Sequence, residues 1–221
     1  MMGPSGHVQA HAQPALGTGM AGTVSLAIRT HLWISWARIA LKHEAMAHAA
    51  RQDMQQPGAD QSRLLEREAD AGLVGICAAA FALEAISREM DELGMVPAAT
   101  RAAWRKNRLS DDKQILELVK LAVDPKGLVN VWKRELAWLF GVRGSSVHYR
   151  GIFESPQLHP LGTNVAPSQI TYSAENTARA VDLLLGILER CRDKPKPPAR
   201  KWSQDMRGAV NDLIRRRGRA E

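Results

Sequence analysis

Residues 143–148 read RGSSVH, so an arginine is followed five positions later by a histidine. An imidazole titrates near neutral pH and can give or take a proton. A guanidinium presents a planar fork of donors that suits phosphoryl oxygens. Arg143 and His148 therefore have the chemistry for proton transfer at a phosphate ester. The alternative for His148 is a structural histidine at the end of a helix.

The same spacing occurs at Arg38 and His43, so the position of the pair matters more than the pattern. Those two residues lie in a long segment with helical periodicity, where five steps of about 100° place them roughly 140° apart. In the 143–148 motif, by contrast, Gly144 follows Arg143 at a point where a helix is expected to end. A break there would let the guanidinium and the imidazole converge on one point.

Glu84 is a carboxylate within an otherwise apolar stretch, residues 73–86. We expect it to face the 143–148 motif and to orient Arg143 or His148. Two other roles stay open, an exposed helical carboxylate and a simple buried ion pair.

Four further residues complete the candidate site. Ser145 and Ser146 have hydroxyls that can donate to phosphate, or that cap the next helical turn. Tyr149 and Arg150 follow the histidine and are expected to line the same cleft, touching a base or a phosphate.

Apolar residues recur at three- and four-residue steps along most of the chain, which predicts an all-α, up-and-down bundle of four to five core helices. No set of strands is expected. The helices are predicted at 23–52, at about 60–93, from 111 to about 123, from about 129 to 141–144, and at 173–192, with shorter helical pieces at 100–105 and 203–217.

The two ends differ in composition from the predicted bundle domain, residues 23–192. Residues 1–22 have no apolar periodicity and are expected to form a disordered leader. Residues 193–221 follow a Pro-rich linker and are expected to form a basic tail with one short helix. From Arg192 onward there are ten Lys and Arg against four Asp and Glu, so this end carries most of the net charge of +7. Two roles for such a tail stay open: it attracts polyanions such as nucleic acid, or it only keeps the protein soluble.

Two cysteines, Cys77 and Cys191, form neither a disulfide framework nor a metal-ligand spacing, which favours a cytoplasmic protein. The longest apolar run, residues 71–83, is too short to span a bilayer, so no membrane is expected. No metal or other cofactor is expected.

Residues 62–192 resemble the HEPN superfamily of helical ribonuclease and toxin-like domains. The long second helix contains FALEAI at 81–86, the Arg–His motif follows a Trp- and Leu-rich helix, and a Pro/Gly loop leads to the YSAE start of a terminal helix at 172–175. The chain departs from the family pattern at Gly144, where catalytic members commonly have a polar residue.

The resemblance implies a metal-independent endoribonuclease in which the RNA's own 2′-hydroxyl attacks the adjacent phosphodiester. His148 would be general base or acid, and Arg143 would stabilise charge on the phosphoryl oxygens. It also implies a homodimer with two motifs facing one cleft, and a role in a toxin–antitoxin pair or in phage defence, with an antitoxin or other partner protein.

Two alternatives stay open at this point. One is a helical module that has lost catalysis and binds RNA or a partner protein. The other is a DNA-associated protein whose basic tail, above all residues 215–219, makes salt-sensitive phosphate contacts.

Overall fold

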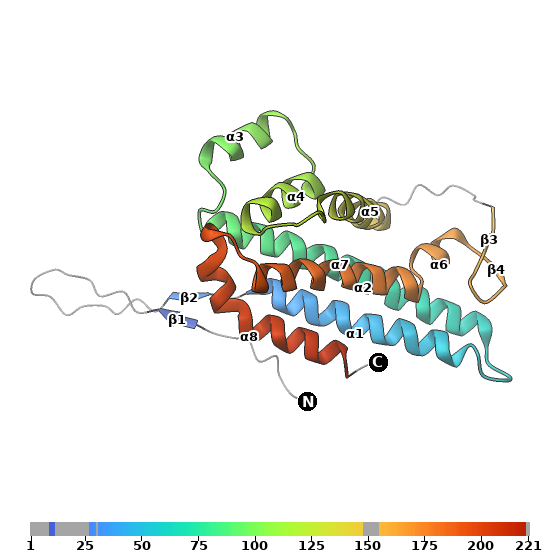
Figure 1. The fold of residues 1–221 in the computed structure, drawn as a ribbon. Coiled ribbons are helices and arrows are strands. Elements are labelled where there is room, and N and C mark those ends of the chain that lie inside the picture. Colours follow the sequence, from blue (N-terminus) through green and yellow to red (C-terminus); the bar gives the residue numbers. More distant parts are fainter. Residues whose placement is uncertain (1–8, 12–26, 30, 148–154, 220–221) are drawn as a thin grey trace, which may run out of the picture.

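The computed structural model describes residues 9–11, 27–29, 31–147 and 155–219, and these residues are mostly helical (Figure 1). The predicted all-α bundle is confirmed. Its helices are α1 (Leu32–Asp53), α2 (Gln61–Glu92), α3 (Ala98–Lys106), α4 (Asp111–Ala122), α5 (Val129–Val147), α6 (Pro167–Thr171), α7 (Ala174–Asp193) and α8 (Arg200–Arg217), with a 3₁₀ turn, η1 (Pro197–Ala199).

The core lies between α1, α2 and α7, which pack against one another along much of their length (Figure 1). Helix α8 packs on α1 and α7, and the α4–α5 pair packs on α2. The side chains at the centre are large aliphatic groups with almost no exposure, among them Ile76, Leu83, Leu184, Ile187 and Leu188. Burial of this apolar surface is the main source of stability for such a bundle.

Helix α2 is the central helix, and its start was predicted from the sequence. The Asp60 side chain accepts a hydrogen bond from Arg63 N at 3.2 Å and so caps the first turn. By length and composition alone, α2 could cross a membrane. However, 56% of its apolar window is buried in the fold, as in the core helix of a bundle.

Two glycines let α7 approach α2 closely. A Cβ at Gly72 would lie 1.8 Å from the backbone oxygen of Tyr172, and one at Gly75 would lie 2.6 Å from Cγ2 of Thr177. Neither gap admits a methyl group, so the packing of the first turn of α7 depends on both positions lacking a side chain.

The predicted end of α5 at residues 141–144 is wrong, because the helix continues through Gly144 to Val147. Gly144 is not among the glycines with positive φ, the conformation that ends many helices. Ser145 Oγ donates to Gly141 O at 3.0 Å, and Ser146 Oγ donates to Arg143 O at 2.7 Å. Both hydroxyls thus bond to carbonyls of the last turns of α5, and Gly144, which has no positive φ, does not interrupt the helix.

Short strands lie at two places where none was expected. In the chain before α1, β1 (Gln9–His11) pairs antiparallel with β2 (Ala27–Arg29), and α1 begins at Leu32 rather than at Thr23. The apolar spacing predicted a helix that includes Ile28, but this residue lies in β2. The predicted loop at 150–172 contains a hairpin of β3 (Gln157–Leu158) and β4 (Asn164–Val165), followed by α6.

Residues after 192 are part of the bundle, which corrects the expectation of a separate tail. Helix α8 buries one face against α1 and α7, and the buried residues include Trp202, Met206, Val210 and Leu213. They recur at steps of four, four and three residues. This apolar stripe was overlooked in the sequence because nine basic residues dominate the segment.

Candidate functional site

A groove of about 630 Å³ lies along the N-terminal turns of α1 and the C-terminal half of α2. Its floor contains an aromatic pair, Trp36 and Phe81, whose ring centroids are 5.0 Å apart. Its lining combines these rings with charged side chains of α2: Leu32, Trp36, Phe81, Glu84, Ala85, Arg88, Glu89 and Glu92.

Two of the predicted catalytic residues meet at this groove. Arg143 Nη2 lies 2.8 Å from Glu84 Oε1, and the Arg143 guanidinium also lies 5.3 Å from the centroid of the Phe81 ring. The side chains are 29% and 15% exposed for Arg143 and Glu84. Glu84 thus contacts Arg143, which fits both the expected positioning role and the alternative of a simple ion pair.

The ion pair leaves hydrogen-bonding capacity unused. Among the residues described, Arg143 Nε and Glu84 Oε1 are buried without a well-aligned hydrogen bond. Unsatisfied buried donors are costly. Both atoms are covered by the fold and out of reach of a ligand, so only the exposed part of the guanidinium can meet an anion.

The electrostatic surroundings of Glu84 are mixed. Burial raises the pKa of its carboxyl above the ordinary value, and Asp111 acts in the same direction, while Arg143 and Arg88 oppose the rise. A carboxyl with a raised pKa beside a cation is typical of functional sites, although structural ion pairs show the same pattern.

The far end of the groove is held by structural hydrogen bonds. His31 Nδ1 donates to the Glu89 carboxylate at 3.0 Å, and Trp202 Nε1 donates to the same carboxylate at 2.8 Å. All three residues are buried. This buried cluster fixes α8 and the start of α1 against α2, and Glu89 has little capacity left for a ligand.

The remaining predicted site residues divide into two groups. Ser145 and Ser146 use their hydroxyls on α5 carbonyls, and Ser146 Oγ also lies 3.4 Å from Cys77 Sγ, so neither is an N-terminal cap. The other three, His148, Tyr149 and Arg150, lie outside the described residues. Convergence of His148 on Arg143 stays a prediction, but a helix break at Gly144 no longer supports it.

The second copy of the motif behaves as the helical geometry predicts. Arg38 points to α8, where its Nη2 lies 3.5 Å from Asp212, whereas the Cβ of His43 lies near Gly75 of α2. The two side chains diverge, so this copy forms no joint site.

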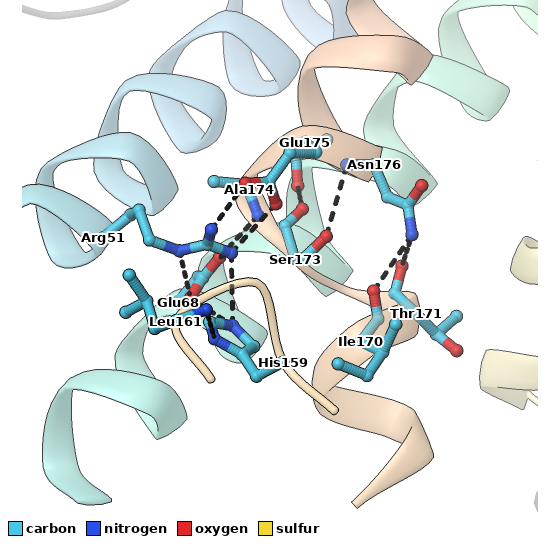
Figure 2. A network of polar contacts seen from close by, with 11 residues as sticks. Arg51, Glu68, His159, Leu161, Ile170, Thr171, Ser173, Ala174, Glu175 and Asn176 are labelled. Carbon is cyan, nitrogen blue, oxygen red and sulfur yellow. Dashed lines mark hydrogen bonds and ion pairs between the residues drawn. The ribbon is translucent and has the colours of Figure 1, made fainter. Parts of the chain in front are cut away.

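A second charged cluster, which sequence reasoning missed, joins α1, α2, the β3–β4 hairpin and α7 (Figure 2). Arg51 Nη2 donates to Glu68 Oε1 at 2.6 Å and to Glu175 Oε2 at 2.9 Å. Glu68 also accepts from the backbone N of Ala174 at 2.7 Å. Glu68 and His159 are each 1% exposed, so this part of the cluster is buried, whereas the Glu175 side chain is 55% exposed.

The contacts of His159 favour opposite tautomers. Leu161 N donates to Nδ1 at 3.3 Å, which leaves the proton on Nε2 toward Glu68 Oε2 at 3.3 Å, whereas Arg51 Nη2, a donor, lies 3.1 Å from the same Nε2. Burial lowers the pKa of His159, and the neighbouring Arg51 lowers it further against the opposing effect of the two carboxylates. The neutral ring thus ties the hairpin to α1, α2 and α7.

Part of this cluster could have been predicted from the positions of Arg51 and Glu68 within their helices. Arg51 follows Ala47 and Ala50 on the inward side of α1, and Glu68 follows Leu64 and Leu65 on the inward side of α2. Charged residues at apolar positions of two helices predict a buried pair. The contribution of His159 had no comparable signal, because it comes from an irregular loop.

The basic C-terminal segment is less free than its composition indicates. Arg217 Nη2 pairs with Glu44 at 2.8 Å, and Arg217 also pairs with Asp182. Arg216 Nε donates to Asp212 at 2.7 Å. Two of the arginines expected in a phosphate-binding tail are thus engaged within the fold.

The chain was compared with models of protein families, with curated proteins and with solved structures, and no match was found in any of the three.

Proposed function

We propose that the protein is a metal-independent endoribonuclease of the HEPN type that acts in the cytoplasm. One observation carries the proposal: Arg143 pairs with Glu84 at 2.8 Å beside the groove that Trp36 and Phe81 line, and 29% of its side chain stays exposed to an anion. A planar guanidinium in this setting suits the oxygens of a phosphodiester.

In the proposed reaction, the 2′-hydroxyl of RNA attacks the adjacent phosphorus and the bond to the 5′-oxygen of the next nucleotide breaks. The products are a 2′,3′-cyclic phosphate and a 5′-hydroxyl. Arg143 stabilises the charge that develops on the phosphoryl oxygens. His148, which lies outside the described residues, takes the role of general base or acid, and Glu84 is a positioning residue for Arg143.

The homodimer belongs to the same proposal, and the surface of α5 supports it. Only Trp132, Leu136 and Leu139 of this apolar helix are buried, while Val147, one helical turn after Arg143 and on the same side of the helix, is 65% exposed. A second copy packed on this face would bring two Arg143 side chains to one cleft. A toxin or phage-defence role, with an antitoxin partner, follows from the family resemblance alone.

Incubation of labelled RNA with the protein in EDTA tests the proposal. We expect wild type to leave 2′,3′-cyclic phosphate ends, and His148→Ala to leave the RNA intact. RNA methylated at every 2′-oxygen should resist both proteins. Cleavage that needs a divalent ion, or that yields 3′-hydroxyl ends, would contradict the mechanism.

A second candidate is a non-catalytic helical module that binds RNA or a partner protein. The continuous course of α5 through Gly144 favours it, because the expected means of bringing Arg143 and His148 together is missing. Binding of RNA without any cleavage by wild type would support this alternative.

A further inference from the structure

One face of α8 carries an exposed polar stripe. Its members follow one another at steps of four, three, four and four residues, which keeps them within one side of an α-helix. The stripe consists of Arg200, Gln204, Arg207, Asn211 and Arg215, all exposed. The opposite face of α8 is the apolar one buried in the bundle.

The arginines of this stripe keep much of their charge available. Arg200 and Arg207 form no ion pair with any carboxylate in the described part of the chain, and Arg207 Nη2 donates only to the backbone oxygen of Arg192, at 3.3 Å. Arg215 is 68% exposed and approaches Asp212 only to 4.0 Å. By contrast, Arg216 and Arg217 on the neighbouring side of the helix are closely paired.

A groove of about 420 Å³ runs beside the stripe, where α8 faces the end of α7. Its lining is Arg192, Gly208, Asn211, Ile214 and Arg215. Gly208 leaves it open, because a Cβ at this position would meet no atom within 4 Å.

We propose that this stripe and groove bind the sugar–phosphate backbone of a single-stranded nucleic acid. That this strand is RNA rests on the proposed function. Arg200, Arg207 and Arg215 are seven and eight residues apart, or about 10 and 12 Å at about 1.5 Å per residue. This spacing corresponds to roughly three nucleotide steps of a stacked strand, at about 3.4 Å each.

The same features argue against a lipid surface as the partner. A membrane-bound amphipathic helix inserts its apolar face between lipids. In α8 that face is taken up by the bundle, with Trp202 and Leu213 at 4% and 0% exposure. A guanidinium group binds a phosphate through two parallel hydrogen bonds. The backbone of a nucleic acid presents such phosphates repeatedly along one strand.

Substitutions at Gly208 test the site without disturbing the core. We expect Gly208→Glu to weaken binding of a labelled single-stranded 2′-O-methyl oligonucleotide about two- to fivefold and Gly208→Lys to strengthen it by a similar factor, relative to Gly208→Ala. Fluorescence anisotropy measures the affinities. Arg207→Ala should also reduce the slope of log affinity against log salt by about 0.7.

Equal affinities of the Glu and Lys variants would overturn the inference, as would binding to anionic vesicles but not to the oligonucleotide. The 2′-O-methyl strand has no free 2′-hydroxyl, so binding is measured without cleavage. If Gly208→Glu and Gly208→Lys bind the oligonucleotide equally well while wild type still cleaves RNA, only this binding site is refuted. If the two variants differ in affinity as expected but wild type does not cleave RNA, only the proposed ribonuclease activity is refuted.

Discussion

Replacing Glu68 by glutamine tests whether the buried cluster around Arg51 holds the bundle together. The Glu68 carboxylate accepts hydrogen bonds from Arg51 Nη2 at 2.6 Å, Arg51 Nε at 3.2 Å and Ala174 N at 2.7 Å. All three groups can only donate, and glutamine replaces one acceptor oxygen by an NH₂ group. The substitution therefore creates a donor–donor clash at either orientation of the amide and removes the charge that balances Arg51.

Loss of one partner from a buried ion pair costs about 3–5 kcal/mol. For a chain of this length, such a loss lowers the midpoint of thermal unfolding by roughly 6–20 °C. Thermal and urea unfolding followed by circular dichroism measure the change. Glu66→Gln, two residues away on the exposed side of α2, is the matched control and should stay within about 0.5 kcal/mol of wild type. A Glu68→Gln protein as stable as the Glu66→Gln control would refute the reasoning.

Three further predictions concern pH, packing and thiol reactivity. Because the pKa of His159 is lowered in the folded protein, mainly by burial, the unfolded chain takes up the proton first, and the free energy of unfolding should fall as pH drops below about 6.5. His159→Gln should flatten that fall in urea titrations at several pH values; an unchanged slope would contradict the assignment. Gly72→Ala should destabilise the fold by about 1–3 kcal/mol, because its Cβ would collide with backbone atoms. Gly186→Ala has open space around it and should stabilise the helix by about 0.5–1 kcal/mol. Shifts of the two unfolding midpoints in the same direction would contradict this contrast. Burial raises the pKa of Cys191 to about 12, so alkylation at pH 8 followed by mass spectrometry should leave it unmodified until the chain unfolds.

The helices with clear apolar periodicity were predictable from the sequence. Helices α2 and α7 begin and end within two residues of their expected bounds, since Asp60 and Ser173 cap them as their residue types predict. Helix α8 was only half recognised, because its five buried apolar residues are spread among polar and basic ones.

The candidate site was predictable in part. The meeting of Glu84 and Arg143 followed from a carboxylate in an apolar helix and a guanidinium near a helix end. The course of α5 through Gly144 did not, because glycine fits both a helical and a positive-φ backbone, so its residue type alone does not tell whether the helix ends there. Long-range partners such as His159 depend on how a loop returns to the bundle, which local patterns do not encode.

The most direct test of the account is the single-turnover rate of RNA cleavage in EDTA by Arg143→Ala, compared with Arg134→Ala. Both arginines lie on α5, but Arg134 is 71% exposed and pairs only with Glu135 among the described residues. The proposed mechanism predicts a cleavage rate at least about 10²-fold below that of wild type for Arg143→Ala and an unchanged rate for Arg134→Ala. Equal rates for the two variants, or no cleavage by wild type, would contradict it.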